Sequence, residues 1–359
     1  MKLKKKILSA IFAGLLTFNI FGNVDNAQAA SRAEIAAINV KKPADFKYWT
    51  KDSAVIKQLT NYVKDVTNKR SKNFIPVEDR IATFDMDGTL VCETAPSYIG
   101  WLFPIDNVLD NHTDNVHDNL CARAQAWRNG IETHNITDAI NIDRKKIIAE
   151  TFAGMTEDDY KARFKKFMNK NVEGLTNLTY GESFYLPMIE IISYLNANDF
   201  SVYIVTGSER NLARTLIEGA VNVKPDHIIG EDVPLNWRRA GSEKYFVKGD
   251  KIYFANEPMN TTTRINKIYC IKREIGKKPV LAFGNSSGDY DMLNYTLTDN
   301  KYKAASFILM CDDLTRELGN LDTAEKVRQA AIKNGWTPVS MKNDFKTIYG
   351  DKVVRSLDR

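Results

Sequence analysis

Two aspartates, Asp85 and Asp87, follow an apolar run at residues 81–84 and precede Gly88 and Thr89. The run is typical of a buried strand, and the glycine marks where the strand stops. In open α/β sheets, ligands bind at the carboxyl ends of the strands, where these two carboxylates would lie. A turn rich in Asp and Gly is the alternative that involves no chemistry. Two acids paired at the end of a strand are more typical of a catalytic or metal-binding site than of such a turn.

Other apolar runs along the chain also end in polar residues, and helical patterns separate them. The runs are residues 202–205 before Thr206-Gly207, the short pair 228–229, and residues 279–283 before the loop from Gly284 to Asp289. Strands that alternate with helices predict parallel pairing. We therefore expect an α/β fold with a Rossmann-like, doubly wound and mostly parallel sheet.

Residues 97–181 differ from the rest, because helical spacing dominates them and no buried strand is evident. A segment of this length between two strands predicts an inserted α-helical cap domain. A β-hairpin is also expected at residues 243–254, which alternate on both sides of a Gly-Asp pair. The expected parts are a signal peptide at 1–29, a helical leader at 30–75, a core domain at 76–96 and 182–359, and the cap at 97–181.

The first 29 residues have the order of an export signal: four lysines, an apolar run, and Ala27-Gln28-Ala29. An uncleaved membrane anchor is the alternative, although the apolar run is shorter than the roughly 20 residues that a span needs. A glycan on the sequon at Asn285 would block the expected site, which favours a bacterial origin. We expect an extracytoplasmic protein, periplasmic or secreted, with no stable membrane span after signal removal.

The formal charge of +5 falls to +2 without residues 1–29, which hold four lysines and one aspartate. No stripe of Lys and Arg interleaved with aromatic residues is evident, so nucleic acid is not an expected partner. The sequence indicates no oligomeric state. One or two disulfides are possible in an oxidising compartment. The four cysteines are Cys92, Cys121, Cys270 and Cys311.

The helix before the 279–283 strand also carries a lysine. The motifs along the chain are thus two aspartates, Thr206-Gly207, a lysine and the loop that ends at Asp289, and this order resembles that of the haloacid dehalogenase superfamily. Residues 84–93 and 283–293 are similar to an exported bacterial branch of phosphoserine-phosphatase-like proteins, as is the tail from Trp336 to Ile348. The resemblance covers roughly residues 75–350. It implies a Mg²⁺-dependent phosphomonoesterase that acts through an aspartyl-phosphate.

The resemblance implies different roles for the two acids. Asp85 would attack phosphorus, and Asp87 would protonate the leaving alkoxide and then accept a proton from water. Because two negative partners repel, Mg²⁺ would be held by Asp85, the Asp87 main-chain carbonyl, Asp289 and Asn285. The superfamily commonly has Asp where Asn285 stands, so we expect weaker metal affinity than in a fully acidic loop.

Phosphate binding is expected to involve Thr206 and Gly207, although Thr206 could instead be an ordinary helix N-cap. Lys267 best matches the phosphate lysine of the family, with Lys272 as the second choice. In phosphoserine-type phosphatases, a glutamate near the position of Glu93 contacts the substrate ammonium. An ion pair at the hinge is the alternative for Glu93.

A cap that closes over the site would exclude polymers, so the expected partner is a small phosphomonoester. Phosphoserine, phosphocholine and a broad range of esters are the candidates. Two alternatives stay open: a phosphomutase of the same superfamily, and a non-catalytic protein that binds a phosphate ligand.

Overall fold

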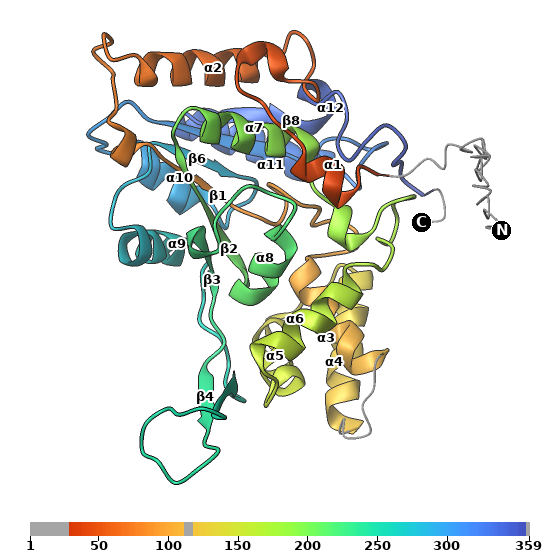
Figure 1. The fold of residues 1–359 in the computed structure, drawn as a ribbon. Helices are drawn as coiled ribbons and strands as arrows, with labels where there is room; N and C mark the ends of the chain where they lie inside the picture. The colour runs from red at the N-terminus through yellow and green to blue at the C-terminus, as the bar shows by residue number, and fades with distance from the viewer. Residues whose placement is uncertain (1–28, 111–117, 357–359) are drawn as a thin grey trace, which may run out of the picture.

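A six-stranded sheet forms the centre of the molecule in the computed structural model, which describes residues 29–110 and 118–356 (Figure 1). The strand order is β3-β2-β1-β6-β7-β8, and all neighbouring pairs are parallel. The strands are β1 (Ile81–Phe84), β2 (Ser201–Glu209), β3 (Ile228–Glu231), β6 (Leu281–Gly284), β7 (Ala305–Met310) and β8 (Thr337–Ser340). The predicted α/β fold with a doubly wound sheet is confirmed.

Helices cover both faces of this sheet, because alternate residues of each strand point to opposite sides. In β6, Leu281 and Phe283 belong to one hydrophobic cluster and Ala282 to another. The first cluster includes α2 (Ala54–Thr67) and α7 (Leu186–Ala197). The second includes α9 (Ile265–Cys270), α10 (Tyr290–Leu297) and α11 (Leu321–Asn334). Figure 1 shows α2 and α7 together on one side of the sheet.

Of the five α-helices of the described chain between β1 and β2, the first four group beside the sheet (Figure 1). They are α3 (Ile99–Leu109), α4 (Asp118–Glu132), α5 (Asp138–Phe152) and α6 (Glu157–Phe167). The Phe103 ring lies 5.1 Å from Phe152, 5.4 Å from Tyr160 and 5.0 Å from Phe164, between ring centroids. These rings form a small aromatic core where the cap was expected. The division of the chain into domains stays an interpretation.

The N-terminal helices α1 (Arg32–Ala36) and α2 lie in the segment expected to be a helical leader. Ala29 and Ala30 donate backbone hydrogen bonds to Asn177 and Tyr349, both at 2.9 Å. The expected signal peptide, apart from Ala29, lies outside the described residues. Among residues 29–110 and 118–356, we find no helix whose length and apolarity would suffice to span a bilayer.

One local prediction is wrong. Strands β4 (Leu235–Arg238) and β5 (Lys251–Phe254) form an antiparallel hairpin, so residues 243–248 lie in the connecting loop and not in its first strand. The alternation of residues 243–248 misled the prediction, because loop residues can alternate without pairing. All four cysteines are free, so the disulfides considered possible are not formed.

In addition to short 3-10 turns, three further helical elements follow strands or helices of the core. They are α8 (Arg210–Ile217) directly after β2, a π-helical turn at Ile271–Ile275 directly after α9, and α12 (Met341–Asp344) directly after β8.

Candidate active site

The carboxyl ends of β1, β2 and β6 meet at the centre of the sheet and bring the predicted residues together. β1 pairs with both neighbours, and the Asp85 N–H donates to the Phe283 carbonyl at 2.9 Å. A pocket of about 380 Å³ opens at this edge. Six of the eight predicted site residues line it, namely Asp85, Asp87, Glu93, Gly207, Lys267 and Asp289. Thr206 and Asn285 contact these residues but do not line the pocket.

Lys267 reaches the site from α9 and is buried, with 1% of its surface exposed. Its ammonium lies 2.5 Å from Asp85 Oδ1 and 2.7 Å from Asp289 Oδ1, and it donates to the Val205 carbonyl at 2.5 Å. Burial opposes the charged form of Lys267, but Asp289 and Asp85 outweigh burial and raise its pKa. The ammonium therefore stays charged between the two carboxylates.

The carboxyl group of Asp85 titrates above its ordinary range. Burial raises its pKa first, the negative charge of Asp289 raises it further, and Lys267 opposes both effects. A nucleophile must be ionised, so the site needs positive charge in addition to Lys267 to hold Asp85 as a carboxylate at neutral pH.

Asp87 is oriented by two hydroxyl groups from the carboxyl end of β2. Its Oδ2 accepts from Ser208 Oγ at 2.7 Å and from Thr206 Oγ1 at 3.3 Å. Its Oδ1 is buried and has no hydrogen-bond partner among the described residues. Burial raises the pKa of Asp87, against the hydrogen bonds from Ser208 and Thr206. These features suit a carboxyl group that gives and takes a proton.

The loop after β6 approaches the turn after β1 closely. Asp289 Oδ2 accepts from the N–H groups of Asn285 and Ser286 at 3.0 and 3.1 Å, which fixes the loop. Gly88 has φ +78°, and a Cβ there would lie 2.0 Å from Asn285 Nδ2 and 2.4 Å from the carboxyl carbon of Glu93. Only glycine allows these side chains to pack against the turn.

Glu93 accepts a hydrogen bond from Asn285 Nδ2 at 2.7 Å. Burial raises the pKa of Glu93 well above its usual value, and the charges of Asp85, Asp87 and Asp289 add to this. The hinge ion pair considered above is not formed, because no lysine or arginine of the described chain pairs with Glu93 in the structure. Glu93 is therefore available at the pocket wall.

The donor set fits a divalent cation. Four carboxylates, those of Asp85, Asp87, Glu93 and Asp289, face a single buried amine, that of Lys267. The unpartnered Asp87 Oδ1 and the raised pKa of Asp85 both mark negative charge that Lys267 does not balance. Within the described residues, no group of three His, Cys, Asp or Glu side chains is arranged to ligate a metal by itself. A metal here would also need carbonyl or amide oxygens, such as those of Asp87 and Asn285.

Two arginines that sequence reasoning did not select also line the pocket. Arg144 on α5 lies over the Trp101 ring at 4.8 Å and donates to Asn141 Oδ1 at 2.7 Å. No acidic side chain of the described chain forms an ion pair with Arg144. Arg264, just before α9, also lines the pocket and has φ +55°. A backbone angle this rare for a non-glycine residue is typical of functional loops.

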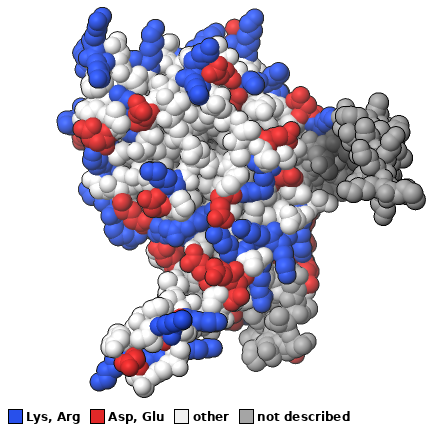
Figure 2. Space-filling view, in the orientation of Figure 1, with Lys and Arg blue, Asp and Glu red and all other residues white. Residues whose placement is uncertain are grey.

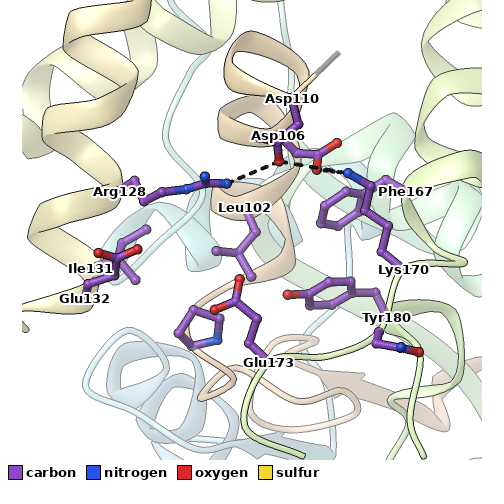
Figure 3. A pocket seen from close by; sticks show the side chains of 12 residues that line it. Leu102, Asp106, Asp110, Arg128, Ile131, Glu132, Phe167, Lys170, Glu173 and Tyr180 are labelled. Carbon is purple, nitrogen blue, oxygen red and sulfur yellow. Dashed lines mark hydrogen bonds and ion pairs between the residues drawn. The ribbon is translucent and has the colours of Figure 1, made fainter. Parts of the chain in front are cut away.

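A second pocket, of about 140 Å³, lies between α3, α4 and the end of α6. Figure 3 shows Arg128 and Lys170 directed toward Asp106 and Asp110. Lys170 pairs with Asp106, and Arg128 lies 3.5 Å from Asp110. None of the predicted site residues lines this pocket, so the chemistry is expected at the strand ends.

A family model described as haloacid dehalogenase-like hydrolase matches residues 82–294, more than half of the chain. The protein belongs to the haloacid dehalogenase-like hydrolases. The match spans β1 to α10 and so contains every predicted site residue. The predicted superfamily and the prediction of a hydrolase are confirmed, whereas the exported branch stays a prediction.

Solved structures show distant similarity to this hydrolase. A functionally unknown protein from Anaerococcus prevotii has a TM-score of 0.49 and 12% identity over 82% of this chain and 92% of that chain. A protein of unknown function from Bordetella pertussis has a TM-score of 0.47 and 13% identity over 72% and 97%. Cytosolic 5'-nucleotidase IIIB bound to cytidine has a TM-score of 0.45 and 12% identity over 81% and 88%. Among proteins with curated descriptions, none matches the chain significantly.

Proposed function

We propose that this haloacid dehalogenase-like hydrolase is a Mg²⁺-dependent phosphomonoesterase for small organic phosphates. The observation that carries the proposal is the contact of Asp85 at the end of β1 with the buried ammonium of Lys267, beside Asp87. A carboxylate nucleophile, a fixed positive charge and a second acid are the parts that phosphoryl transfer requires.

In the proposed mechanism, a carboxylate oxygen of Asp85 attacks phosphorus and the bond from phosphorus to the ester oxygen breaks. The Asp87 carboxyl group gives its proton to the leaving oxygen, which departs as an alcohol. A water molecule then attacks the aspartyl-phosphate and gives its proton to Asp87, which restores both acids and releases phosphate. Lys267 balances charge on the phosphoryl oxygens.

The metal site would be formed by Asp85, Asp289, Asn285 and the main-chain carbonyl of Asp87. Mg²⁺ bound there would neutralise charge on the phosphoryl group. Ser208 and Thr206 hold the Asp87 carboxyl group in position. Thr206 thus donates a hydrogen bond to Asp87 in the structure. We propose that Thr206 and Gly207 contact the phosphate once substrate is bound.

The pocket wall favours a substrate with a second negative group. Arg144 and Arg264 line the same pocket as Asp85, and Glu93 adds a buried carboxyl group. A phosphorylated amino acid such as phosphoserine offers a carboxylate for an arginine and an ammonium for Glu93. Phosphocholine has no negative group apart from its phosphate, so phosphoserine is the better of the two candidates.

We also propose that the enzyme acts outside the bacterial cytoplasm. The proposal is based on the order of basic, apolar and small residues in positions 1–29. A fractionation experiment that finds the full-length chain in the cytoplasm would contradict it.

Release of phosphate from p-nitrophenyl phosphate tests the proposed reaction. Activity should be abolished by Asp85→Asn and by EDTA, and kept by Asp291→Asn, because Asp291 does not line the pocket. Tight binding of a phosphate ester without release of phosphate would favour a binding protein. Transfer of the phosphoryl group to a second sugar phosphate, with none released, would favour a phosphomutase.

A further inference from the structure

The hairpin of β4 and β5 lies outside the central sheet and projects from the body of the molecule (Figure 1). In its register, Leu235 lies opposite Phe254, and Trp237 lies opposite Ile252. Directly opposed residues share one face of a two-stranded ribbon. These four apolar residues therefore form one face, and the other face carries Asn236, Arg238, Lys251 and Tyr253.

Contacts with the helical segment hold the base of the hairpin. The Phe254 carbonyl accepts from the Gly154 N–H at 2.8 Å, and the Phe254 N–H donates to the Met155 carbonyl at 2.9 Å. The Phe254 ring is buried and lies 5.1 Å from Tyr160. The hairpin thus leaves the body from a fixed base.

Trp237 is half-buried against Phe246 and Arg239, and four other apolar side chains of the hairpin lack the cover that Phe254 has within the described chain. Leu235 is 62% exposed and Ile252 is 43% exposed, and in the connecting loop Tyr245 and Phe246 are 67% and 58% exposed. These are four of the twelve large exposed hydrophobic residues in the described chain, although the hairpin has only 20 residues. A concentration of exposed apolar side chains on one projecting element is typical of a contact surface.

The hairpin is also basic. Residues 235–254 contain five Lys or Arg residues and two acids. One of these acids, Asp250, accepts from the N–H groups of Ala240 and Val247 at 2.6 and 2.8 Å, which orders the loop. Figure 2 shows Lys and Arg side chains along this projecting arm, with uncharged surface between them.

We propose that this hairpin docks the enzyme onto the surface of an anionic lipid bilayer. Aromatic and aliphatic side chains would enter the interface while Lys and Arg side chains contact the charged headgroups. Two hairpins carrying the same positive charge would repel each other, which disfavours a second copy as the partner. Nucleic acid would match the charge but would leave the aliphatic Leu235 and Ile252 without a role.

Docking through this hairpin would also orient the pocket. The chain runs from β5 through residues 255–262 to Thr263 and Arg264, which line the active site. The surface-bound enzyme would therefore hold its pocket in a fixed orientation relative to the membrane.

Fluorescence quenching by brominated lipids tests the proposal at the hairpin itself, in the full-length chain. Phe246→Trp should be quenched by vesicles of brominated phosphatidylcholine mixed with phosphatidylglycerol. The matched control is Ile332→Trp on α11, which is 59% exposed and should show no added quenching over the unsubstituted protein. Each basic residue near an anionic surface contributes about fivefold in affinity. Lys244→Glu with Lys248→Glu should therefore weaken partition by at least about 30-fold, the factor expected from losing two positive charges alone, and Lys326→Glu with Lys333→Glu should leave it unchanged.

Several results would overturn docking on anionic lipid. They are absence of quenching at position 246, equal quenching in pure phosphatidylcholine, and equal effects of the two double variants on partition. Association of the protein into dimers that Phe246→Ser abolishes would assign the hairpin to a second copy. Retardation of a DNA or RNA oligonucleotide that depends on Lys244 and Lys248, with no lipid binding, would assign it to nucleic acid.

Discussion

Replacing Lys267 by methionine should destabilise the fold and nearly abolish activity. The substitution keeps the length of the side chain but removes the charge that lies 2.5 Å from Asp85 and 2.7 Å from Asp289. Both carboxylates would stay buried without a cation. Breaking a buried ion pair on one side costs about 3–5 kcal/mol, so we expect a loss of that size in the free energy of unfolding when EDTA is present.

The effect on catalysis has two sources. Lys267 opposes the rise in the pKa of Asp85, so without it a smaller fraction of the nucleophile is ionised at neutral pH. The charge that balances the phosphoryl oxygens is lost as well. Such electrostatic contributions are worth about 3–4 kcal/mol, which predicts a fall in kcat/KM of about a hundred-fold to a thousand-fold.

Urea unfolding and p-nitrophenyl phosphate hydrolysis measure the two effects. Lys272→Met is the matched control, because Lys272 is exposed five residues further along the same helical segment. It should change stability by no more than about 0.5 kcal/mol and leave kcat/KM unchanged. The reasoning would be refuted if Lys267→Met were as stable and active as the unsubstituted protein, or if Lys272→Met were the more damaging variant.

Three other perturbations have defined outcomes. Asp87→Asn should slow hydrolysis of alkyl phosphates by about a hundred-fold to ten-thousand-fold, and slow p-nitrophenyl phosphate less, because its leaving group needs no proton. Gly88→Ala should cost about 1–3 kcal/mol in the free energy of unfolding and lower kcat/KM, since the added Cβ meets Asn285 and Glu93. Burial raises the pKa of Glu190 from 4.5 to about 7, so the folded state holds this proton more tightly than the unfolded state. Its stabilising contribution is therefore complete below pH 4.5 and is lost as the pH rises through 7, by up to about 3 kcal/mol.

For each of these three predictions, a specific result would contradict it. Equal slowing of alkyl and p-nitrophenyl esters would remove Asp87 as the general acid. An active, fully stable Gly88→Ala protein would show that the turn tolerates a side chain. For Glu190, urea unfolding at pH 5 and pH 8 should show a smaller difference in Glu190→Gln than in the unsubstituted protein. An unchanged difference would assign the pH dependence to other groups.

The strand ends were accessible to sequence reasoning because their signal is local. The apolar runs before Asp85, Thr206 and Asn285 correspond to β1, β2 and β6, and parallel pairing places their ends together. The resemblance favours Lys267 over Lys272, because Lys267 stands at the start of the helix that leads to the next strand, where the family has its phosphate lysine. The structure buries Lys267 between two carboxylates and leaves Lys272 exposed.

Residues whose role depends on tertiary contacts were missed. Ser208 lies in β2, and only the parallel pairing of β2 with β1 brings its hydroxyl to Asp87. Arg144 has the appearance of a solvated helical residue until α5 packs against the pocket. The basic and aromatic residues of the 235–254 hairpin alternate faces, so they form a contiguous surface only after β4 and β5 pair.

The position of β1 in the middle of the sheet has a consequence for the timing of folding. Its two neighbours come from much later in the chain, since Ala82 pairs with Val202 and with Leu281. Asp85 and Lys267 are separated by 182 positions. Contacts over such separations form late, because a long loop must close before they are made. A chain that is still being synthesised, or is held unfolded for transport, therefore has no assembled catalytic centre, and its activity begins only with complete folding.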